Sequence, residues 1–239
     1  MSQYRSNLRW IRTPQQARSQ ETLERILDAA EVLISDKGVD DTSVAEVARR
    51  AGSSVGAFYT RFRDKDGLFY ALYDRYLEQA MATADDALDP ARWQGIGVRE
   101  MLDSVVRFLV EIYRDRRGLM RAFVLRNHTD PEFGARQERL SHYVSDKLGA
   151  LLLARSEQIR HPDPARAAAF GLILCFASIE SAVLFGEVRS GSLSLSDEDL
   201  ASELVRAFVA YLGIDPSPDA ASPDDSPGPR AGDTAKEPS

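Results

Sequence analysis

The sequence predicts an all-α protein, with a small N-terminal helical domain followed by a larger C-terminal helical bundle. Apolar residues recur three and four positions apart through most of the chain up to about residue 212, which is the period of an amphipathic helix. No stretch alternates apolar and polar residues as a half-buried strand does, so we expect no sheet. Glycine and proline turns separate the helical stretches, which predicts several helices rather than one long rod.

The composition is that of an ordinary globular protein, with 239 residues of which 44% are hydrophobic and 28% charged. A net charge of −7 argues against a nucleic-acid partner only if it is spread evenly, and here it is not. The single Cys175 excludes an intramolecular disulfide framework and a cysteine-based metal cluster. The N-terminus lacks the apolar segment of a secretory signal, and the longest apolar run, 167–177, is too short to span a bilayer. We therefore expect a cytoplasmic protein with no membrane partner.

Residues 1–19 form a basic N-terminal segment. It contains four arginines and no acid: Arg5, Arg9, Arg12 and Arg18. One interpretation is a solvated terminus without fixed structure. The other is an arm that follows a DNA backbone or enters a minor groove, as arms of some DNA-binding proteins do. The first helix should follow, from about residue 20 to 35, and end near Gly38.

Two short helices joined by a tight glycine turn are predicted next. Ser43-x-x-Glu46 is a capping-box pattern at the start of the first, and Gly52 suits the left-handed residue that often ends a helix. Ser53 or Ser54 can cap the second. This order of elements is typical of a helix-turn-helix unit. Its second helix would present small and polar side chains: Ser54, Val55, Gly56, Ala57, Tyr59, Thr60 and Arg61.

Positive charge gathers around this pair of helices. From Arg49 to Lys65 the sequence holds five basic residues and one acid. Cations beside hydroxyl groups are what contacts to DNA phosphates require. The plain alternative is a small amphipathic helical hairpin with solvated ends, because glycine turns alone are weak evidence for DNA binding.

The run from Thr22 to Leu68 resembles the N-terminal DNA-binding domain of the TetR family of transcriptional regulators. The resemblance extends without a gap and is carried by Ile26, Leu27, Ala29, Ala30, Gly38, Thr42, Ser43, Val44, Val47, Ala48, Ala51, Gly52, Ser54, Gly56, Phe58, Tyr59, Phe62, Lys65, Asp66 and Leu68. It implies a three-helix DNA-binding domain at 20–66, with the helix-turn-helix at about 43–62. Ser53 and Arg61 depart from the residues frequent in the family, so the base preference stays open.

By this resemblance, the second helix of the pair would enter the major groove of a double-stranded DNA operator. Ser54, Val55, Ala57 and Thr60 would face base edges, with Gly56 leaving room for close approach. Phosphates would be held by Thr42, Ser43, Tyr59, Arg61 and Lys65. Two such helices related by a two-fold axis would read a palindromic site, with half-sites about one helical turn apart.

Residues 67–212 are expected to form a helical domain for ligand binding and dimerisation. Helices are predicted at about 64–87, 98–115, 117–127, 132–158, 163–189 and 197–212. By resemblance, the first of these transmits movement between the two domains. The segment 163–189 is apolar almost all round and must be covered on more than one side. A homodimer through helices 163–189 and 197–212 would cover it, and a central core helix is the alternative.

The bundle also offers residues for a small-molecule pocket. The candidates combine aromatic rings with a few polar groups: Trp93, Phe108, Tyr113, Phe123, His128, His142, Tyr143, Phe176 and Glu180. Any one of the rings could instead be a core residue. Glu180 is an acid on an apolar helix, so it needs a partner, which could equally be an arginine across a dimer interface. The effector is not identified, and no cofactor is implied.

Enzymatic function is weakly supported. Glu138 and His142 lie four residues apart and could share a metal with His128, but such pairs are more often ordinary polar contacts. No phosphate-binding loop, nucleophile elbow or paired-carboxylate motif is present. We therefore predict no catalytic residues and no metal. The acidic, proline-rich segment 213–239 should be disordered.

The hypothesis that best joins these patterns is a ligand-responsive regulator, a repressor released from its operator by a small molecule. The rival is a helical ligand-binding or scaffold protein that does not bind DNA. Basic charge around the predicted reading helix, together with Tyr59 and Lys65, favours the regulator.

Overall fold

The computed structural model describes residues 17–186 and 188–214, whose regular secondary structure is helical apart from one short hairpin. The all-α prediction is confirmed. The helices are α1 (Ala17–Lys37), α2 (Val44–Arg50), α3 (Val55–Tyr59), α4 (Lys65–Ala87), α5 (Val98–Asp115), α6 (Arg117–Thr129), α7 (Pro131–Leu153), α8 (Pro164–Phe185) and α9 (Asp197–Leu212), with short 3-10 turns at Pro90–Trp93 and Ser156–Gln158. Most of the predicted basic arm and of the predicted acidic tail lies outside the described residues.

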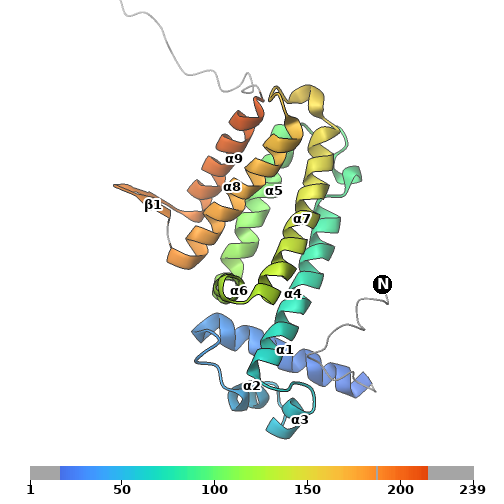
Figure 1. The fold of residues 1–239 in the computed structure, drawn as a ribbon, viewed down its shortest axis with the longest axis vertical. Coiled ribbons are helices and arrows are strands. Elements are labelled where there is room, and N and C mark those ends of the chain that lie inside the picture. The colour runs from blue at the N-terminus through green and yellow to red at the C-terminus, as the bar shows by residue number, and fades with distance from the viewer. Residues whose placement is uncertain (1–16, 187, 215–239) are drawn as a thin grey trace, which may run out of the picture.

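Helices α1, α2 and α3, with the first turns of α4, form the lower part of the molecule in Figure 1, which we call the head. The predicted capping box begins α2: the Ser43 hydroxyl accepts from the Glu46 backbone N–H at 3.2 Å, and the Glu46 carboxylate accepts from the Ser43 N–H at 3.1 Å. Phe58 and Phe62 are fully buried, with ring centroids 5.1 Å apart, in the same core as Ile26 of α1. This packing fixes how α3 is presented.

Helix α4 continues from the head into the larger unit above it, which we call the body (Figure 1). At 23 residues it is about 35 Å long. Its N-terminal part buries Leu68 and Leu72. Further along, Tyr73 is fully buried and stacks on Phe133 of α7 at a centroid distance of 3.8 Å. One rigid element therefore belongs to both units.

The rest of α4 and helices α5 to α9 make up the body. Helix α8 packs against α5, α6, α7 and α9. A Cβ built on Gly171 of α8 would lie only 1.9 Å from the ring of Phe208 in α9, so glycine is what permits these two helices to approach so closely. Phe208 itself is fully buried. The pair α8 and α9 thus forms a tightly packed edge of the body.

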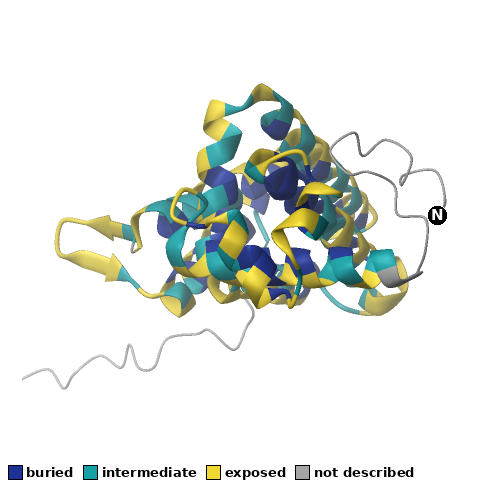
Figure 2. Cartoon of the chain, turned by 90° about the horizontal axis from the view of Figure 1, so that it is seen from below, coloured by how far each residue is buried: buried dark blue, intermediate teal, exposed yellow. Residues whose placement is uncertain are grey.

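The expectation of no sheet is wrong at one place. Strands β1 (Val188–Ser190) and β2 (Leu193–Leu195) form an antiparallel hairpin, with Val188 opposite Leu195. Gly191 takes a φ of +59° in the turn between them. Three residues per strand are too few for the alternating pattern that reveals strands in sequences. The hairpin projects from the helices and is largely exposed (Figure 2).

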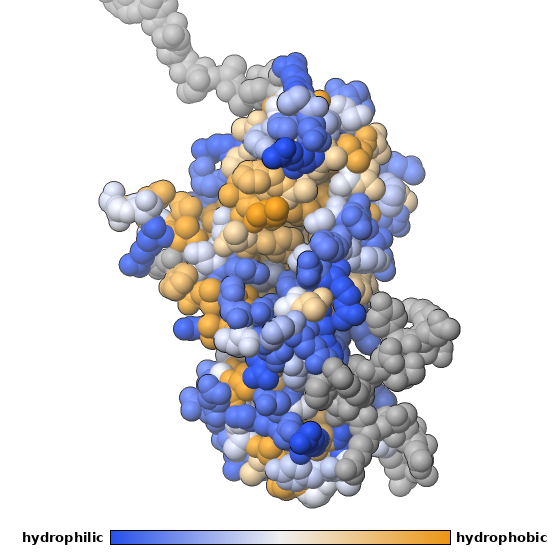
Figure 3. Space-filling model, viewed as in Figure 1, coloured by the Kyte–Doolittle hydropathy of each residue, from blue (hydrophilic) through white to orange (hydrophobic). Residues whose placement is uncertain are grey.

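Helix α8 is long and apolar enough to cross a membrane by length and composition. The continuous run 167–177 therefore understated its apolar character. In the body this composition has a structural use, because Leu172, Cys175 and Ile179 are buried against neighbouring helices. Its other face is exposed, with Phe170 at 48% and Ile173 at 63% of full exposure. Apolar residues gather on the part of the body that contains α8 (Figure 3).

Candidate nucleic-acid interface

The exposed face of α3 carries most of the side chains predicted to read DNA. Val55 is 42% and Tyr59 49% exposed, and Gly56 and Thr60 are also exposed. Phe58 points the other way, into the core. A helix with small and polar groups on its outer face and one large buried side chain can approach another surface closely while it stays packed in the head.

Hydrogen bonds fix the two ends of α3. The Ser54 hydroxyl accepts from the Ala57 backbone N–H at 3.0 Å, which caps the N-terminus. At the other end, the Thr60 hydroxyl donates to the Ala57 carbonyl at 2.8 Å, and Arg61 Nη1 donates to the same oxygen at 2.8 Å. The backbone of α3 is therefore held in place from both sides.

Arg61 also ties α3 to α1. Its Nη2 donates to the Ser19 hydroxyl at 3.1 Å, while its buried Nε has no hydrogen-bond partner among the described residues. The side chain is partly buried, so in this conformation it positions α3 rather than extending toward solvent. Ser19 lies 42 residues away in the sequence, and no local pattern could have revealed the contact.

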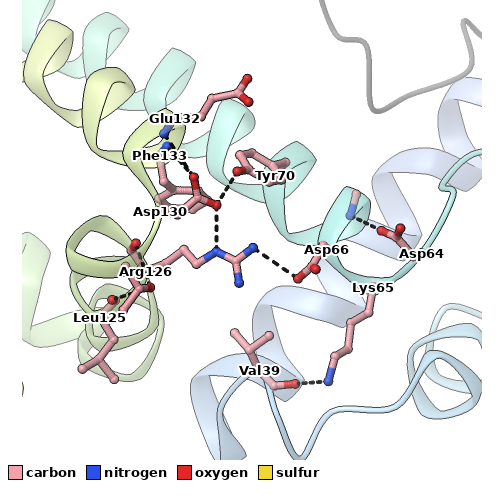
Figure 4. Close-up of polar contacts among 12 residues, drawn as sticks. Val39, Asp64, Lys65, Asp66, Tyr70, Leu125, Arg126, Asp130, Glu132 and Phe133 are labelled. Carbon is pink, nitrogen blue, oxygen red and sulfur yellow. Dashed lines mark hydrogen bonds and ion pairs between the residues drawn. The ribbon is translucent and has the colours of Figure 1, made fainter.

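Thr42 and Lys65, both predicted to hold phosphates, are engaged within the head. Thr42 is 2% exposed and its hydroxyl donates to the Gly38 carbonyl at 2.7 Å. Lys65 Nζ donates to the carbonyls of Val39 and Asp40, at 2.8 and 3.1 Å (Figure 4). Both side chains therefore stabilise the loop between α1 and α2, and a phosphate would have to compete with these bonds.

Ser43 is exposed, but its hydroxyl is shared with the capping box. The more exposed positive charge of the head lies elsewhere. Arg49 and Arg50 are exposed at the last turn of α2, and the Arg63 side chain is 92% exposed just beyond α3. The local charge count contained this signal, although these arginines were not singled out as contacts.

The head meets the body at α6 and at the start of α7. A Cβ on Gly118, in the first turn of α6, would lie 1.9 Å from the backbone oxygen of Ser35 in α1, so the two backbones are in close contact. Arg126 of α6 reaches Asp66 of α4 at 3.4 Å and Asp130 at 3.1 Å (Figure 4).

Tyr70 of α4 joins the same network, because its hydroxyl donates to Asp130. Burial, together with this bond to the carboxylate, raises the pKa of Tyr70 to about 12. Asp130 also caps α7 through the N–H groups of Glu132 and Phe133. A movement of α6 is thereby connected to α4 through bonded side chains.

The body contains a cavity of about 580 Å³ between α4, α5, α7 and α8, a size typical of small-molecule sites. Three of the residues predicted for a pocket line it: Phe108, Tyr113 and Phe176. Sequence reasoning missed Tyr76, Gln79, Arg116, Gln137 and Ser141, which also line it. These residues come from α4, from α7 and from the link between α5 and α6, so only their spacing on each helix was visible in the sequence.

The other predicted pocket residues do not line this cavity. Trp93 donates its indole N–H to the Ala87 carbonyl, and Phe123 packs against the rings of Tyr73 and Phe133. Tyr143 bonds to Asp85 on the outside of the bundle. The remaining three are placed as follows: His128 and His142 are exposed, and Glu180 is half-buried on α8 with its pKa raised by burial. Among residues 17–186 and 188–214, no group of three or more His, Cys, Asp or Glu side chains is arranged to hold a metal.

Two family models match the chain. One, described as bacterial regulatory proteins of the tetR family, covers residues 26–72. The other, described as the tetracyclin repressor-like C-terminal domain, covers residues 98–212. The first match contains α2 and α3, and the second contains all helices from α5 to α9.

Curated relatives are transcriptional regulators. AcrR of Shigella flexneri is 44% identical over 63 residues, which are 26% of this chain and 28% of AcrR. An uncharacterised helix-turn-helix regulator of Mycobacterium tuberculosis is 26% identical over 194 residues, or 79% of this chain and 93% of its own.

Solved structures share the fold. A TetR transcription regulator from Haloarcula marismortui aligns with a TM-score of 0.63 at 18% identity, covering 81% of this chain and 97% of its own. A transcriptional regulator from Rhodococcus aligns with a TM-score of 0.60 at 24% identity, covering 82% and 99%. With a helix-turn-helix in the head, a matching body and regulators as relatives, the chain belongs to the TetR family of DNA-binding transcriptional regulators.

Proposed function

We propose that this regulator is a dimeric repressor that binds a palindromic DNA operator through α3 and leaves it when a small molecule enters the body. The observation that carries the proposal is the exposed face of α3, where Val55 and Tyr59 stand on a short helix fixed at both ends. In this role Ser54, Val55, Gly56, Ala57 and Thr60 lie against base edges. We also propose that the protein acts in the cytoplasm and catalyses no reaction.

The phosphate contacts in this proposal rest mainly on exposed groups. Tyr59 and Ser43 keep the role that the sequence predicted, and Arg49, Arg50 and Arg63 are added because they are exposed. Lys65 and Arg61 act by holding the loop and α3 in place, through the bonds described above. Thr42 has the same supporting role from inside the head.

The second copy of the chain would cover the apolar face of α8 and α9. Phe170 and Ile173 of α8 are exposed, and Phe170 packs against Tyr211 of α9 with ring centroids 5.1 Å apart. Small exposed residues lie on the same two helices, such as Ala177 and Ala207. Exposed apolar faces of this kind usually mark an interface, and a two-fold axis would let one face cover its own copy.

Release of DNA requires that the effector bind more tightly to the conformation with the wrong head spacing. The cavity between α4 and α8 is the proposed site for it, since α4 lines the cavity and also enters the head. Contacts of α6 with α1 and α4 offer a second connection.

The proposal is tested by selecting bound fragments from a genomic DNA library at two salt concentrations. We expect one palindrome to be enriched, with affinity that falls steeply as salt rises. The Tyr59→Ala variant should lower the affinity for all sequences, whereas Ala57→Arg should change or abolish the choice of site. Folded, dimeric, ligand-free protein that enriches no sequence at low salt would contradict the proposal and favour a helical module that does not bind DNA.

A further inference from the structure

The polar rim of the body cavity has one cation that is shared with the head. Arg116, between α5 and α6, lines the cavity and lies 3.7 Å from the carboxylate of Glu31 in α1. Its Nη1 also donates to the Gln79 side-chain carbonyl at 3.4 Å. Its side chain is 41% exposed. The same guanidinium can therefore serve either the head or a molecule in the cavity.

Hydrogen-bond donors without partners face the same cavity. Tyr76 and Tyr113 both line it, and within the described part of the chain neither hydroxyl makes a hydrogen bond. Burial raises the pKa of both hydroxyls, that of Tyr76 to about 12 and that of Tyr113 well above its ordinary value, so both stay protonated at neutral pH. Gln79 uses its carbonyl for Arg116, which leaves its amide N–H groups to donate. This set is suited to an acceptor that carries negative charge.

Asp115 is an acid that lines the cavity, and it already has a partner. Its carboxylate accepts from Arg114 Nε at 3.0 Å. The remaining lining is mostly apolar, with aliphatic and aromatic side chains such as Val105, Leu109 and Phe176. The cavity thus combines a largely apolar lining with one rim that carries a cation and hydrogen-bond donors.

We infer that the effector is an amphipathic monoanion, an apolar molecule ending in a carboxylate, and that its carboxylate takes Arg116 away from Glu31. This inference rests on the proposed function, because it names the ligand class of the same cavity. Glu31 would not be left unpaired, since Arg75 of α4 keeps its bond to the same carboxylate at 2.8 Å. The exchange breaks a contact between α1 and the body at little electrostatic cost.

The exchange explains how occupancy of the cavity reaches the head. Glu31 lies on α1 one turn before Ser35, whose backbone touches Gly118 of α6. Loss of the Arg116 contact removes a charged tie at this junction, which leaves α1 free to take another position relative to α6. Because coupling is reciprocal, bound DNA should weaken carboxylate binding by the same factor.

The test compares three probes of equal chain length: dodecanoate, 1-dodecanol and dodecyltrimethylammonium. Binding to the full-length protein is measured by calorimetry without DNA, so the result does not depend on operator binding. We expect dodecanoate to bind most tightly. Arg116→Gln should reduce its affinity about tenfold, the loss expected for one charge-assisted contact, and leave the alcohol unchanged. Arg116→Lys should restore part of the preference.

Arg121→Gln is the matched control, because Arg121 lies on α6, is exposed and does not line the cavity. It should bind the three probes as the unchanged protein does. Equal or tighter binding of the alcohol or the ammonium probe, no binding of any probe, or an Arg116→Gln variant that keeps the carboxylate preference would each overturn the inference. Thermal unfolding of each variant checks that it is folded.

The link to the head is tested with Glu31→Gln. This change removes the ion pair of Arg116 with Glu31, so dodecanoate should bind more tightly. The decrease in DNA affinity that dodecanoate causes should become smaller. A Glu31→Gln protein with unchanged probe affinity and unchanged DNA release would reject the exchange. If the unchanged protein prefers dodecanoate but no DNA is ever enriched, the proposed function fails while the ligand class stands.

Discussion

The side chains of Ser54, Thr60 and Arg61 at α3 are bonded within the head, whereas the tyrosine hydroxyls at the body cavity have no partner in the described chain. Ser54, Thr60 and Arg61 all bond to the backbone of Ala57, so the exposed face of α3 is held in one shape before any partner binds. At the cavity, Tyr76 and Tyr113 leave hydrogen-bonding capacity unused. A fixed face suits a partner of constant geometry such as DNA, and a cavity with unused donors suits a ligand that supplies the acceptors.

The close contact between the two units should be the feature most sensitive to mutation. Gly118→Ala places a methyl group 1.9 Å from the Ser35 carbonyl oxygen, so α1 and α6 must separate. We expect a loss of about 2–3 kcal/mol in the free energy of unfolding, as for overpacked cores. Denaturant unfolding measures it.

Gly149→Ala is the control for that variant. Gly149 lies within α7 and a Cβ there meets nothing within 4 Å, so the change should stabilise the helix by up to about 1 kcal/mol. If both variants unfold alike, the head and body do not meet at Gly118 as described.

The role of the Ser54 hydroxyl as the N-terminal cap of α3 can be tested with two substitutions. Ser54→Ala removes the cap of α3 and should lower the free energy of unfolding by about 1 kcal/mol, whereas Ser54→Gly should cost only a few tenths. Operator affinity measured for both variants separates two roles. A lost base contact would affect both equally, and a lost cap would affect Ser54→Ala more. Equal stability of the two variants would show that the hydroxyl does not cap α3.

The sequence revealed the head better than the cavity because the head depends on local patterns. The capping box at Ser43 and Glu46 and the left-handed glycine at Gly52 lie close together in the sequence and were both predicted correctly. The bond from Lys65 to Val39 and the bond from Arg61 to Ser19 were not, since each joins positions more than twenty residues apart. Whether a side chain is exposed cannot be predicted from its residue type when its hydrogen-bond partner is far away in the sequence.

The cavity is harder to predict for the same reason. Its lining comes from residues of several helices, and each aromatic ring in the sequence had two possible places, core or pocket. Phe123 and Tyr113 are both buried rings, yet Phe123 belongs to the cluster around Tyr73 and only Tyr113 reaches the cavity. Arg116 was missed because its significance depends on the distance to Glu31, which periodicity does not contain.

Two tyrosine variants test whether the cavity hydroxyls lack a hydrogen-bond partner in the folded protein. Tyr73→Phe removes a hydroxyl that donates to Gln137 at 2.8 Å, and should lower the free energy of unfolding by about 1 kcal/mol. Tyr113→Phe removes an unpartnered hydroxyl and should change the unfolding free energy by less than about 0.5 kcal/mol. Both residues are buried tyrosines of the same body. A larger loss for Tyr113→Phe would mean that its hydroxyl has a structural partner after all.

The smallest effect concerns two capping boxes, Ser43 with Glu46 in the head and Ser196 with Asp199 in the body. Hydrogen bonds from Lys37 and then from Ser43 lower the pKa of Glu46 to about 2, and bonds from Ser196 lower the pKa of Asp199. A carboxyl whose pKa is lower in the folded state contributes stability that is present above its unfolded pKa and lost as pH falls toward the folded one.

For Glu46 this window runs from its ordinary pKa of 4.5 down to about 2. The melting temperature of the unchanged protein minus that of Glu46→Gln should therefore be constant above pH 5 and shrink below it. Asp199→Asn should show the same sign with a smaller change, because only the head box has a lysine, with Lys37 Nζ 2.8 Å from Glu46. If the melting-temperature difference instead grows as the pH falls, Lys37 does not stabilise the Glu46 carboxylate in the folded state.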